Sequence, residues 1–342
     1  MAQVRRLCLT ALAACCTAAL VAAAAPVLIG PLTGLQVFPA ANWWNLDISQ
    51  APVDASSAAT IDFISGRTPA NRAPIRRLHP DFGPPPYGIP YVVVSGDQPR
   101  VPLAVVAYPG ESDTGAPGLP GYPIPPEARS TPNYIEGGVA GGGSSGDRHL
   151  LIVDRDRGLL YETYATRWNA ALGRWEADSG AVFDLARSDR RPDGWTSADA
   201  AGLAVLPGLV RYDEASGAAE ITHAFRVTTR ATNDYVWPAS HAAGATAGAP
   251  ALGTRLRLKA SRGLSAFPPE VQRIFRAMQR YGLIVADNGS DMYVSGTMDA
   301  RWDNDVLNPA FSALTADDFE VVEAGWTGAP APRPPANLRF VR

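Results

Sequence analysis

Two acidic residues and a histidine stand close together near the middle of the sequence, where they could carry out general acid–base chemistry. Glu136 lies near the end of a Gly/Pro-rich stretch spanning residues 109–148, and Asp147 and His149 follow it closely. Hydrolysis of a glycosidic bond needs one carboxylic acid to protonate the leaving oxygen and a second carboxylate to attack or to activate water. We therefore expect Glu136 to be the general acid or the nucleophile, with Asp147 or Glu162 as its partner. His149 would adjust their protonation.

A predicted hairpin brings Glu162 toward this group. Residues 149–153 and 159–166 are predicted to form two strands around a turn at residues 154–158. A hairpin loop of even length would place Glu162 directly opposite His149. An acid beside a histidine on neighbouring strands could be a catalytic pair, or simply a cross-strand contact that stabilises the sheet. The sequence leaves both roles open for each residue.

Asp199 is a further catalytic candidate. It lies within residues 195–202, where a short helical turn is predicted, and it follows Thr196 by three residues. A threonine followed three residues later by an acid is a capping pattern at the start of helices. Asp199 could therefore act either as a catalytic acid or as part of a helix cap.

Aromatic and arginine side chains supply candidates for binding a sugar. Flat aromatic faces can stack on the apolar C–H surface of sugar rings, and arginine can pair with the carboxylate of an acidic sugar. Tryptophans are also ordinary core residues, and arginines on the outer face of a sheet are usually exposed. The residues predicted to contact the substrate are Tyr134, Trp195, Trp237, Arg255 and Arg257.

The sequence offers little for metal or serine chemistry. Ser144 and Ser145 lie in a glycine-rich loop without the strand that a nucleophile elbow requires. Residues 287–291 and 303–305 are rich in oxygen ligands and could bind a structural calcium, but both are also ordinary turn sequences. We predict no cofactor and no catalytic metal, because four histidines with no metal-binding spacing could meet only in the folded protein. They are His79, His149, His223 and His241.

The first 25 residues have the pattern of an export signal. Arg5 and Arg6 form a basic start, an apolar run follows, and the small residues 22–25 precede Pro26. We expect cleavage there and secretion to the extracellular space or the periplasm, with no membrane contact afterwards. All three cysteines lie within the first sixteen residues, so the cleaved chain would contain neither a thiol nor a disulfide.

Three alternatives to this cleavage stay open. Residues 12–15 fit a lipoprotein cleavage site that would leave a lipid on Cys15, although the residues that follow remain apolar. The arginine pair could belong to a twin-arginine signal. The apolar run over residues 7–29 is also long enough to span a bilayer, which needs about 20 residues. The small residues before Pro26 favour cleavage over these alternatives.

Net charge argues against nucleic acid as a partner. The formal net charge is −3, and it becomes −5 once the signal and its two arginines are removed. Nucleic-acid binding relies instead on clustered positive charge. The expected partner is a polysaccharide substrate, and we expect the protein to be a monomer.

Short strands between Gly/Pro-rich loops dominate the predicted structure. A helix is predicted over residues 54–64, ending at Gly66, and an amphipathic helix over residues 268–281. Residues 283–286 and 292–294 should form a hairpin around Asn288-Gly289. The other predicted strands are residues 91–94, 102–108, 181–185, 221–229, 235–237 and 254–260, with a hairpin over residues 168–175.

This pattern predicts a mostly β fold class. Many short strands and one packed helix are typical of a β-sandwich or jelly roll with long loops. We expect a single β-rich domain over residues 26–327, preceded by the signal peptide at residues 1–25. Residues 328–342 are a Pro-rich tail.

Four motifs resemble those of an uncharacterised group of secreted bacterial proteins. They are WTSADAAG at residues 195–202, RLRLK at residues 255–259, ADNG at residues 286–289 and RWDND at residues 301–305. The resemblance covers most of the mature chain. It implies one exported domain and brings no activity with it.

These features together predict a secreted carbohydrate-active enzyme, a glycoside hydrolase that uses a carboxylate pair. The alternatives are a non-catalytic carbohydrate-binding or cell-surface protein on a β-sandwich, a polysaccharide lyase, and a metal-dependent oxidase that uses histidines. Length favours an enzyme, because binding modules are usually shorter.

Overall fold

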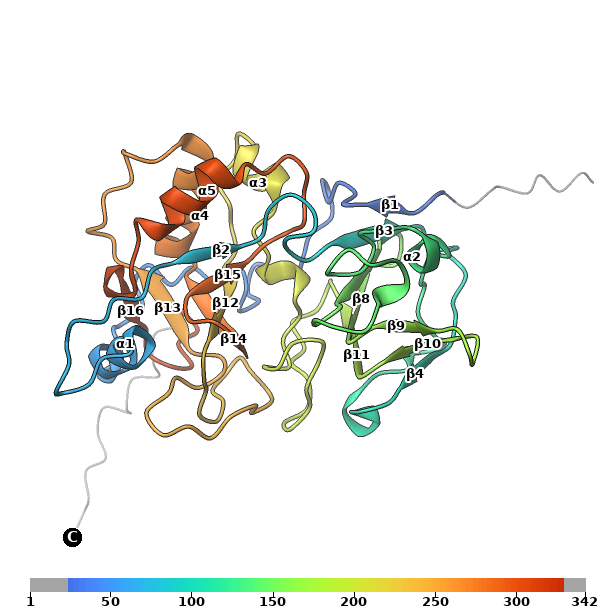
Figure 1. Ribbon diagram of the computed structural model, residues 1–342, viewed down its shortest axis with the longest axis horizontal. Coiled ribbons are helices and arrows are strands. Elements are labelled where there is room, and N and C mark those ends of the chain that lie inside the picture. The colour runs from blue at the N-terminus through green and yellow to red at the C-terminus, as the bar shows by residue number, and fades with distance from the viewer. Residues whose placement is uncertain (1–23, 329–342) are drawn as a thin grey trace, which may run out of the picture.

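Short strands and long loops make up most of the molecule (Figure 1). The computed structural model describes residues 24–328. More of these residues lie in strands than in helices, so the predicted mostly β character is confirmed. The predicted signal peptide lies outside the described residues except for Ala24 and Ala25, and the predicted tail does so except for Gly328.

A six-stranded mixed sheet forms one half of the molecule, which we call the large half. Its strand order is β16-β13-β14-β12-β15-β2. The inner strand β12 runs parallel to β14 and antiparallel to β15. The strands are β2 (His79–Asp81), β12 (Phe225–Thr229), β13 (Arg255–Leu258), β14 (Leu283–Asn288), β15 (Tyr293–Ser295) and β16 (Phe319–Val321).

Helices pack around this sheet. The predicted first helix ends at Gly66, as expected. Helix α5 is unexpected, because Pro309 lies inside it and proline disfavours helix interiors. Its start is capped by Asp303, whose side chain accepts a hydrogen bond from the Asp305 backbone N–H. The helices here are α1 (Ser57–Ser65), α3 (Tyr212–Ser216), α4 (Pro269–Arg280), α5 (Asn304–Ser312) and the 3₁₀ turn η4 (Ala316–Asp318).

Helix α4 is the predicted amphipathic helix, and its apolar face is buried. Ile274, Phe275 and Met278 have no exposed surface and belong to the main core. The helix packs against β13 and α3. It is followed by Gly282 with φ of 79°, where an added Cβ would approach the Leu256 carbonyl oxygen to 2.5 Å. Only glycine fits this tight return into β14.

Ile274→Asp should lower the free energy of unfolding by about 3 kcal/mol or more, because it would bury an unpaired carboxylate in this core. Urea denaturation of the variant and the parent would measure the change. Glu270→Gln, on the partly exposed side of the same helix, should shift stability by less than about 0.5 kcal/mol. An Ile274→Asp protein that unfolds at the parent's urea concentration would show that α4 is not packed on the core.

Two more sheets and a short hairpin form the small half. A five-stranded sheet has the order β1-β3-β7-β8-β11, and a three-stranded sheet has the order β4-β10-β9. Its helical elements are α2 (Glu127–Ser130), η1 (Pro109–Glu111) and η2 (Ala140–Gly142). The strands are β1 (Val27–Leu28), β3 (Tyr91–Val94), β4 (Leu103–Val105), β5 (Gly115–Ala116), β6 (Leu119–Pro120), β7 (Leu150–Asp154), β8 (Leu159–Tyr164), β9 (Arg167–Asn169), β10 (Arg174–Ala177) and β11 (Ser179–Asp184).

Strand β7 is buried on both faces. Leu151 and Val153 belong to the main core, which also contains the apolar side chains of the large half. Leu150 and Ile152 belong to a second core shared with the three-stranded sheet. The continuous apolar run in this strand therefore reflects a sheet covered on both sides.

Strand pairing confirms two predicted hairpins and corrects a third. β7 pairs with β8, and β9 pairs with β10, each antiparallel as predicted. β14 and β15 do not pair with each other, because both flank β12, so the predicted hairpin around Asn288 is wrong.

The strand predicted at residues 235–237 is also wrong, since only an isolated bridge from Tyr235 to Leu252 forms there. A jelly roll is not confirmed: the sheets contain parallel pairs, such as β3 with β7.

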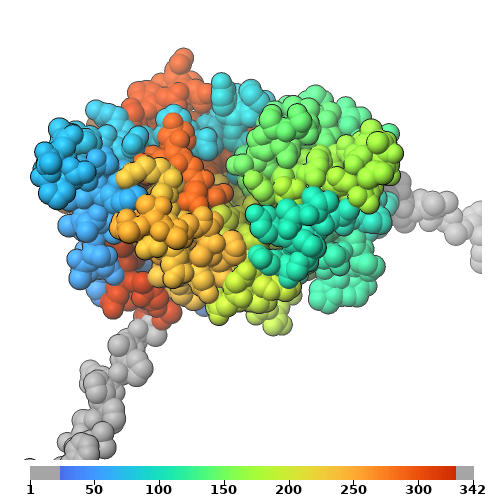
Figure 2. All heavy atoms as spheres, turned by 60° about the horizontal axis from the view of Figure 1, so that its bottom comes forward, coloured from blue at the N-terminus to red at the C-terminus, as the bar shows by residue number. Residues whose placement is uncertain are grey.

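A segment of residues 186–211, here called the connecting segment, lies between the two halves and bonds to both. The Ser179 hydroxyl of β11 donates to the Ser197 carbonyl oxygen, and the Ala201 N–H donates to the Ala286 carbonyl oxygen of β14. The segment contains the 3₁₀ turn η3 (Leu206–Gly208). Figure 2 shows the two halves meeting along a seam. Within residues 24–328, no helix has both the length and the apolar character needed to cross a membrane.

Candidate functional site

Glu136 and His149 form a close ion pair at the edge of the small half. Glu136 lies in the loop between α2 and η2, and His149 directly precedes β7. The Glu136 Oε2 atom lies 2.6 Å from His149 Nδ1 and accepts a hydrogen bond of 3.2 Å from the His149 N–H. The other ring nitrogen, Nε2, lies 2.9 Å from the Ala198 carbonyl oxygen. Because both ring nitrogens face acceptors, both carry hydrogens and the ring is an imidazolium.

The pKa values of the pair agree with this charge state. Burial alone lowers the pKa of His149, but the charge of Glu136 and its hydrogen bond outweigh burial and raise it to about 9. Burial alone raises the pKa of Glu136, but the charge and hydrogen bonds of His149 outweigh burial and hold it below its ordinary value. Glu136 is therefore ionised at neutral pH, and His149 acts as its counter-ion.

A second buried ion pair comes from the large half and the connecting segment. Arg226 of β12 is 4 % exposed, and Asp199 is fully buried. The Arg226 Nη2 atom donates to Asp199 Oδ1 at 2.8 Å, and Nη1 donates to the Ser295 hydroxyl oxygen at 2.6 Å. Nη2 also lies 3.5 Å from Asp287 Oδ2. The guanidinium thus lies between two acids, and only Asp199 pairs with it closely.

Asp287, at the end of β14, has a strongly raised pKa. Burial and the like charge of Asp199 raise its pKa to about 7, although Arg226 and the Asn288 N–H act in the opposite direction. The Asn288 N–H donates to Asp287 Oδ1 at 2.7 Å. A carboxyl group with this pKa is largely protonated in mildly acidic solution, so it can donate a proton.

These five residues, Glu136, His149, Asp199, Arg226 and Asp287, make up what we call the carboxylate cluster. Glu136 has a lowered pKa and Asp287 a raised one. Both are reached by solvent: the Glu136 side chain is 23 % exposed and the Asp287 side chain is 24 % exposed. The positive charge of Arg226 lowers the pKa of both carboxyl groups. One ionised and one protonated carboxyl group beside a shared cation are suited to general acid–base chemistry.

Glu162 is fully buried and is held by the connecting segment. Its two carboxylate oxygens accept hydrogen bonds of 2.8 Å from the Val205 and Leu206 N–H groups at the start of η3. Burial raises its pKa to about 7, despite these two donors. The predicted register is wrong: Glu162 stands opposite Leu151, because the Asp154–Leu159 pair closes the hairpin. We interpret Glu162 as a cap for η3, since no surface of its side chain faces solvent.

Asp147 and Asp199 differ in their surroundings. Asp147 is exposed in the loop before His149. Its negative charge raises the pKa of His149 and that of Asp81 in β2. Asp199 does not cap a helix, because residues 195–202 form an irregular loop with bends and one turn. Its pairing with Arg226 accounts for its burial. The predicted helical turn there is wrong.

The predicted substrate-binding residues do not gather at the carboxylate cluster. Tyr134 is buried in the second core. The Trp195 ring is half-buried beneath the Arg191 guanidinium, and Trp237 packs edge-on against Trp43. Arg257 donates to Glu320 at 2.6 Å. Arg255 is buried on the same strand, β13.

Sequence reasoning missed the roles of Arg226, Asp287 and Tyr164. The sequence presents Arg226 as a sheet-face arginine and Asp287 as part of a turn, and neither pattern reveals that they meet. The centre of the Tyr164 ring lies 5.8 Å from the centre of the His149 ring. The charges of Asp147 and Asp287 contribute to raising the pKa of the Tyr164 hydroxyl, after burial. Tyr164 is half-buried, so it offers an aromatic wall beside the cluster.

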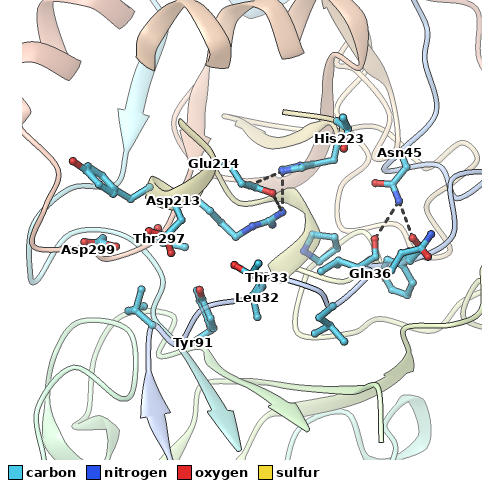
Figure 3. A pocket seen from close by; sticks show the side chains of 18 of the residues that line it. Leu32, Thr33, Gln36, Asn45, Tyr91, Asp213, Glu214, His223, Thr297 and Asp299 are labelled. Carbon is cyan, nitrogen blue, oxygen red and sulfur yellow. Dashed lines mark hydrogen bonds and ion pairs between the residues drawn. The ribbon is translucent and has the colours of Figure 1, made fainter. Parts of the chain in front are cut away.

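A separate polar pocket of about 480 Å³ contains none of the predicted site residues (Figure 3). Its lining includes Tyr91, Glu214 and His223, and the Glu214 carboxylate lies 3.1 Å from His223 Nε2. Arg211 donates to the same carboxylate at 2.6 Å. Burial raises the pKa of Glu214, but the charges of Arg211 and His223 outweigh burial and lower it to about 2. Glu214 is thus a stable anion with two partners, which suits a structural ion pair.

No group of three His, Cys, Asp or Glu side chains in the described part of the chain is arranged to hold a metal ion. The two oxygen-rich turns have other partners. Asp291 accepts from the Arg230 N–H at 2.9 Å and from its guanidinium at 2.8 Å. Asp303 caps α5.

The melting temperature should be highest near pH 5 and should fall as the pH rises to 9. His149 has a folded pKa above its ordinary value, so its stabilising charge is fully present below about pH 6.5 and is lost as the pH approaches 9. Glu162 and Asp287, with folded pKa values of about 7, likewise favour the folded state below their ordinary pKa and lose this contribution through pH 7.

Thermal denaturation across pH 4.5–9 would measure this slope. The variant His149→Gln should melt at a lower temperature, and its slope should be weaker above about pH 6.5 and nearly absent between about pH 8 and 9, where only His149 titrates. Below pH 4.5 the parent should lose stability, because Glu136 and Glu214 have lowered pKa values. A parent melting temperature that rises between pH 5 and 9 would contradict the assigned charge states.

Comparisons with protein-family models, with curated proteins and with solved structures found no match to this chain.

Proposed function

We propose that the protein is a secreted glycoside hydrolase that cleaves an extracellular polysaccharide with Asp287 and Glu136. The observation that carries the proposal is the contrast between these two solvent-reached carboxyl groups beside Arg226. The pKa of Asp287 is raised to about 7, whereas the pKa of Glu136 is held below its ordinary value. Glycosidases separate the pKa values of two carboxyl groups in this way so that one is an acid and the other an anion.

In this mechanism Asp287 protonates the oxygen of the leaving sugar. Glu136 attacks the anomeric carbon or activates a water molecule, as one of the two established glycosidase routes requires. Its Oε2 atom is held by His149, and no residue among those described donates a hydrogen bond to Oε1. Oε1 is therefore the reacting oxygen. His149 positions the carboxylate and keeps it ionised.

Arg226 and Tyr164 support the same chemistry. The Arg226 guanidinium, anchored by Asp199 and Ser295, lies 3.5 Å from Asp287, and its positive charge also lowers the pKa of Glu136. Tyr164 presents a half-buried aromatic ring on which a sugar could stack. The basic start and apolar run of residues 1–25 support secretion, where such a polymer is found.

A second candidate function is non-catalytic sugar binding by the small half. A cavity of about 680 Å³ lies beside the three-stranded sheet, with Trp168 and Trp175 in its lining. The Arg129 guanidinium lies 4.9 Å from the Trp168 ring centroid. An aromatic cavity without a carboxylate pair is typical of a binding module, so this feature favours the alternative.

An activity screen on neutral and acidic polysaccharides tests the proposal. A hydrolase releases new reducing ends, and a lyase also produces an unsaturated, ultraviolet-absorbing sugar end. A binding protein would produce neither and would still be retained on an insoluble polysaccharide. Retention without any cleavage across the panel would reject the hydrolase and favour the cavity beside Trp168.

A further inference from the structure

Strand β2 presents two exposed polar side chains on the outer face of the six-stranded sheet, the face turned away from the main core. Its neighbours Leu78 and Phe82 are buried in that core. Side chains alternate between the two faces of a strand, so His79 and Asp81 point outward, and both are exposed. β2 forms one edge of the sheet, beside β15 (Figure 1). The outer face of this strand is therefore open to a ligand.

The His79 ring lies flat against a tyrosine of the neighbouring strand. His79 is paired in register with Tyr293 of β15. The two ring centres lie 4.2 Å apart, and the ring planes differ by only 13°. Tyr293 is half-buried, so it supports the exposed imidazole from one side. The pair forms a flat, preformed surface on which a sugar ring can stack through its apolar C–H face.

Asp81 lies between this ring pair and the carboxylate cluster. It is paired in register with Ser295 of β15, whose hydroxyl oxygen accepts from Arg226 of β12. Neighbouring strands are about 4.8 Å apart, so two strand spacings place the Asp81 backbone about 10 Å from that of Arg226. Burial raises the pKa of Asp81, and the negative charges of Glu136 and Asp147 raise it further, although Arg226 acts in the opposite direction. Asp81 is thus close to acids of both halves.

The Asp81 carboxyl group has no hydrogen-bond or ion-pair partner among residues 24–328. Asp291, in the loop before β15, is paired with Arg230 instead. An ionised carboxylate only accepts hydrogen bonds, so the free group suits hydroxyl donors such as those of a sugar. Because Glu136 and Asp147 are acids too, like charges would repel a uronic acid here, and a neutral sugar is favoured.

We propose that His79, Tyr293 and Asp81 form a sugar-binding subsite, which holds a neutral polysaccharide beside the bond that Asp287 and Glu136 cleave. The inference rests on the hydrolase function proposed above. One sugar unit stacks on His79, and the hydroxyls of the next unit donate to Asp81. The two residues are two positions apart, about 7 Å along the strand, so these units are neighbours in one chain. The substrate is therefore a polymer that extends well beyond the cleaved bond.

Steady-state kinetics on a neutral polysaccharide test the subsite. His79→Ala should raise KM roughly two- to tenfold, the equivalent of one aromatic contact, with kcat almost unchanged, because the stacked unit is bound equally in the ground and transition states. Asp81→Asn should also raise KM. His79→Phe keeps a flat ring and should restore the parent's KM. Asp189→Asn, an acid with a 68 % exposed side chain, is the matched control and should behave as the parent.

Binding is measured separately with the Asp287→Asn protein, which should hold the polymer without cleaving it. Adding His79→Ala should weaken its retention on an insoluble neutral polysaccharide by the same factor. If the parent cleaves the polymer and His79→Ala keeps the parent's KM and retention, the subsite is wrong while the hydrolase stands. If the parent cleaves nothing, the hydrolase fails and retention decides. Weaker retention of His79→Ala then supports a sugar site at β2, and equal retention, or none, rejects it.

Discussion

Asp287→Asn should reduce polysaccharide hydrolysis by about 10²- to 10⁴-fold, the usual contribution of a general acid, while the melting temperature at pH 5.5 stays almost unchanged. Asparagine has the shape of the protonated carboxyl group but cannot give up a proton to the leaving oxygen. Because the pKa of Asp287 is about 7, the parent already has a neutral side chain at pH 5.5. Initial rates of reducing-end release and melting curves at the same pH would measure both effects.

Two comparisons make this result specific. Asp189→Asn changes an acid with a 68 % exposed side chain and should leave the rate unchanged. Glu136→Gln should also abolish hydrolysis, but it should lower the melting temperature, because His149 would lose the carboxylate that stabilises its charge. The parent's rate should fall as the pH rises through 7. An Asp287→Asn enzyme with the parent's rate and pH profile would show that the acid is a different residue.

Asp199→Asn should lower the free energy of unfolding by about 3–5 kcal/mol, because removing one partner of a buried ion pair leaves the other uncompensated. Arg226 would keep its bond to Ser295 and the contact of 3.5 Å with Asp287 Oδ2, and the amide oxygen of Asn would replace the carboxylate without its charge. Chemical denaturation would measure the loss. The same substitution removes the like charge that raises the pKa of Asp287, so the fall in activity with rising pH should begin at a lower pH.

A double variant controls for this effect. Replacing Asp199 with leucine and Arg226 with methionine removes both charges, and it should recover much of the stability that Asp199→Asn loses. The double variant should still be inactive, because the cation beside Glu136 and Asp287 is gone. If Asp199→Asn loses less than about 1 kcal/mol, the range expected for exposed pairs, then solvent or another group compensates Arg226.

Local patterns in the sequence predict the elements that depend on neighbouring residues. The period of Ile274, Phe275 and Met278 predicts α4 and its buried face. The turn residues 154–158 between two apolar runs predict the β7–β8 hairpin. The proximity of Glu136 and His149 is also a short-range feature, since they lie thirteen positions apart in the sequence. These parts follow from interactions within one stretch of chain.

Contacts between distant strands could not be predicted in this way. The Asn288-Gly289 pair is a strong hairpin signal. In the sheet, however, β12 lies between β14 and β15 and pairs with both, so they do not pair with each other. That insertion brings Arg226 to Asp287. The environment of Glu162 depends on the backbone N–H groups of Val205 and Leu206, and no side-chain pattern reveals those donors.

The order of strands in the six-stranded sheet sets a sequence of folding events. The strands of the small half other than β1 lie in one stretch of the chain, from β3 to β11. They can therefore pair before the later strands have formed. β2 instead pairs with β15, near the other end of the chain. It must therefore wait, with its edge unpaired, until β12 to β15 arrive. Such long-range pairing slows folding, and until it forms, an open strand edge is exposed to other chains.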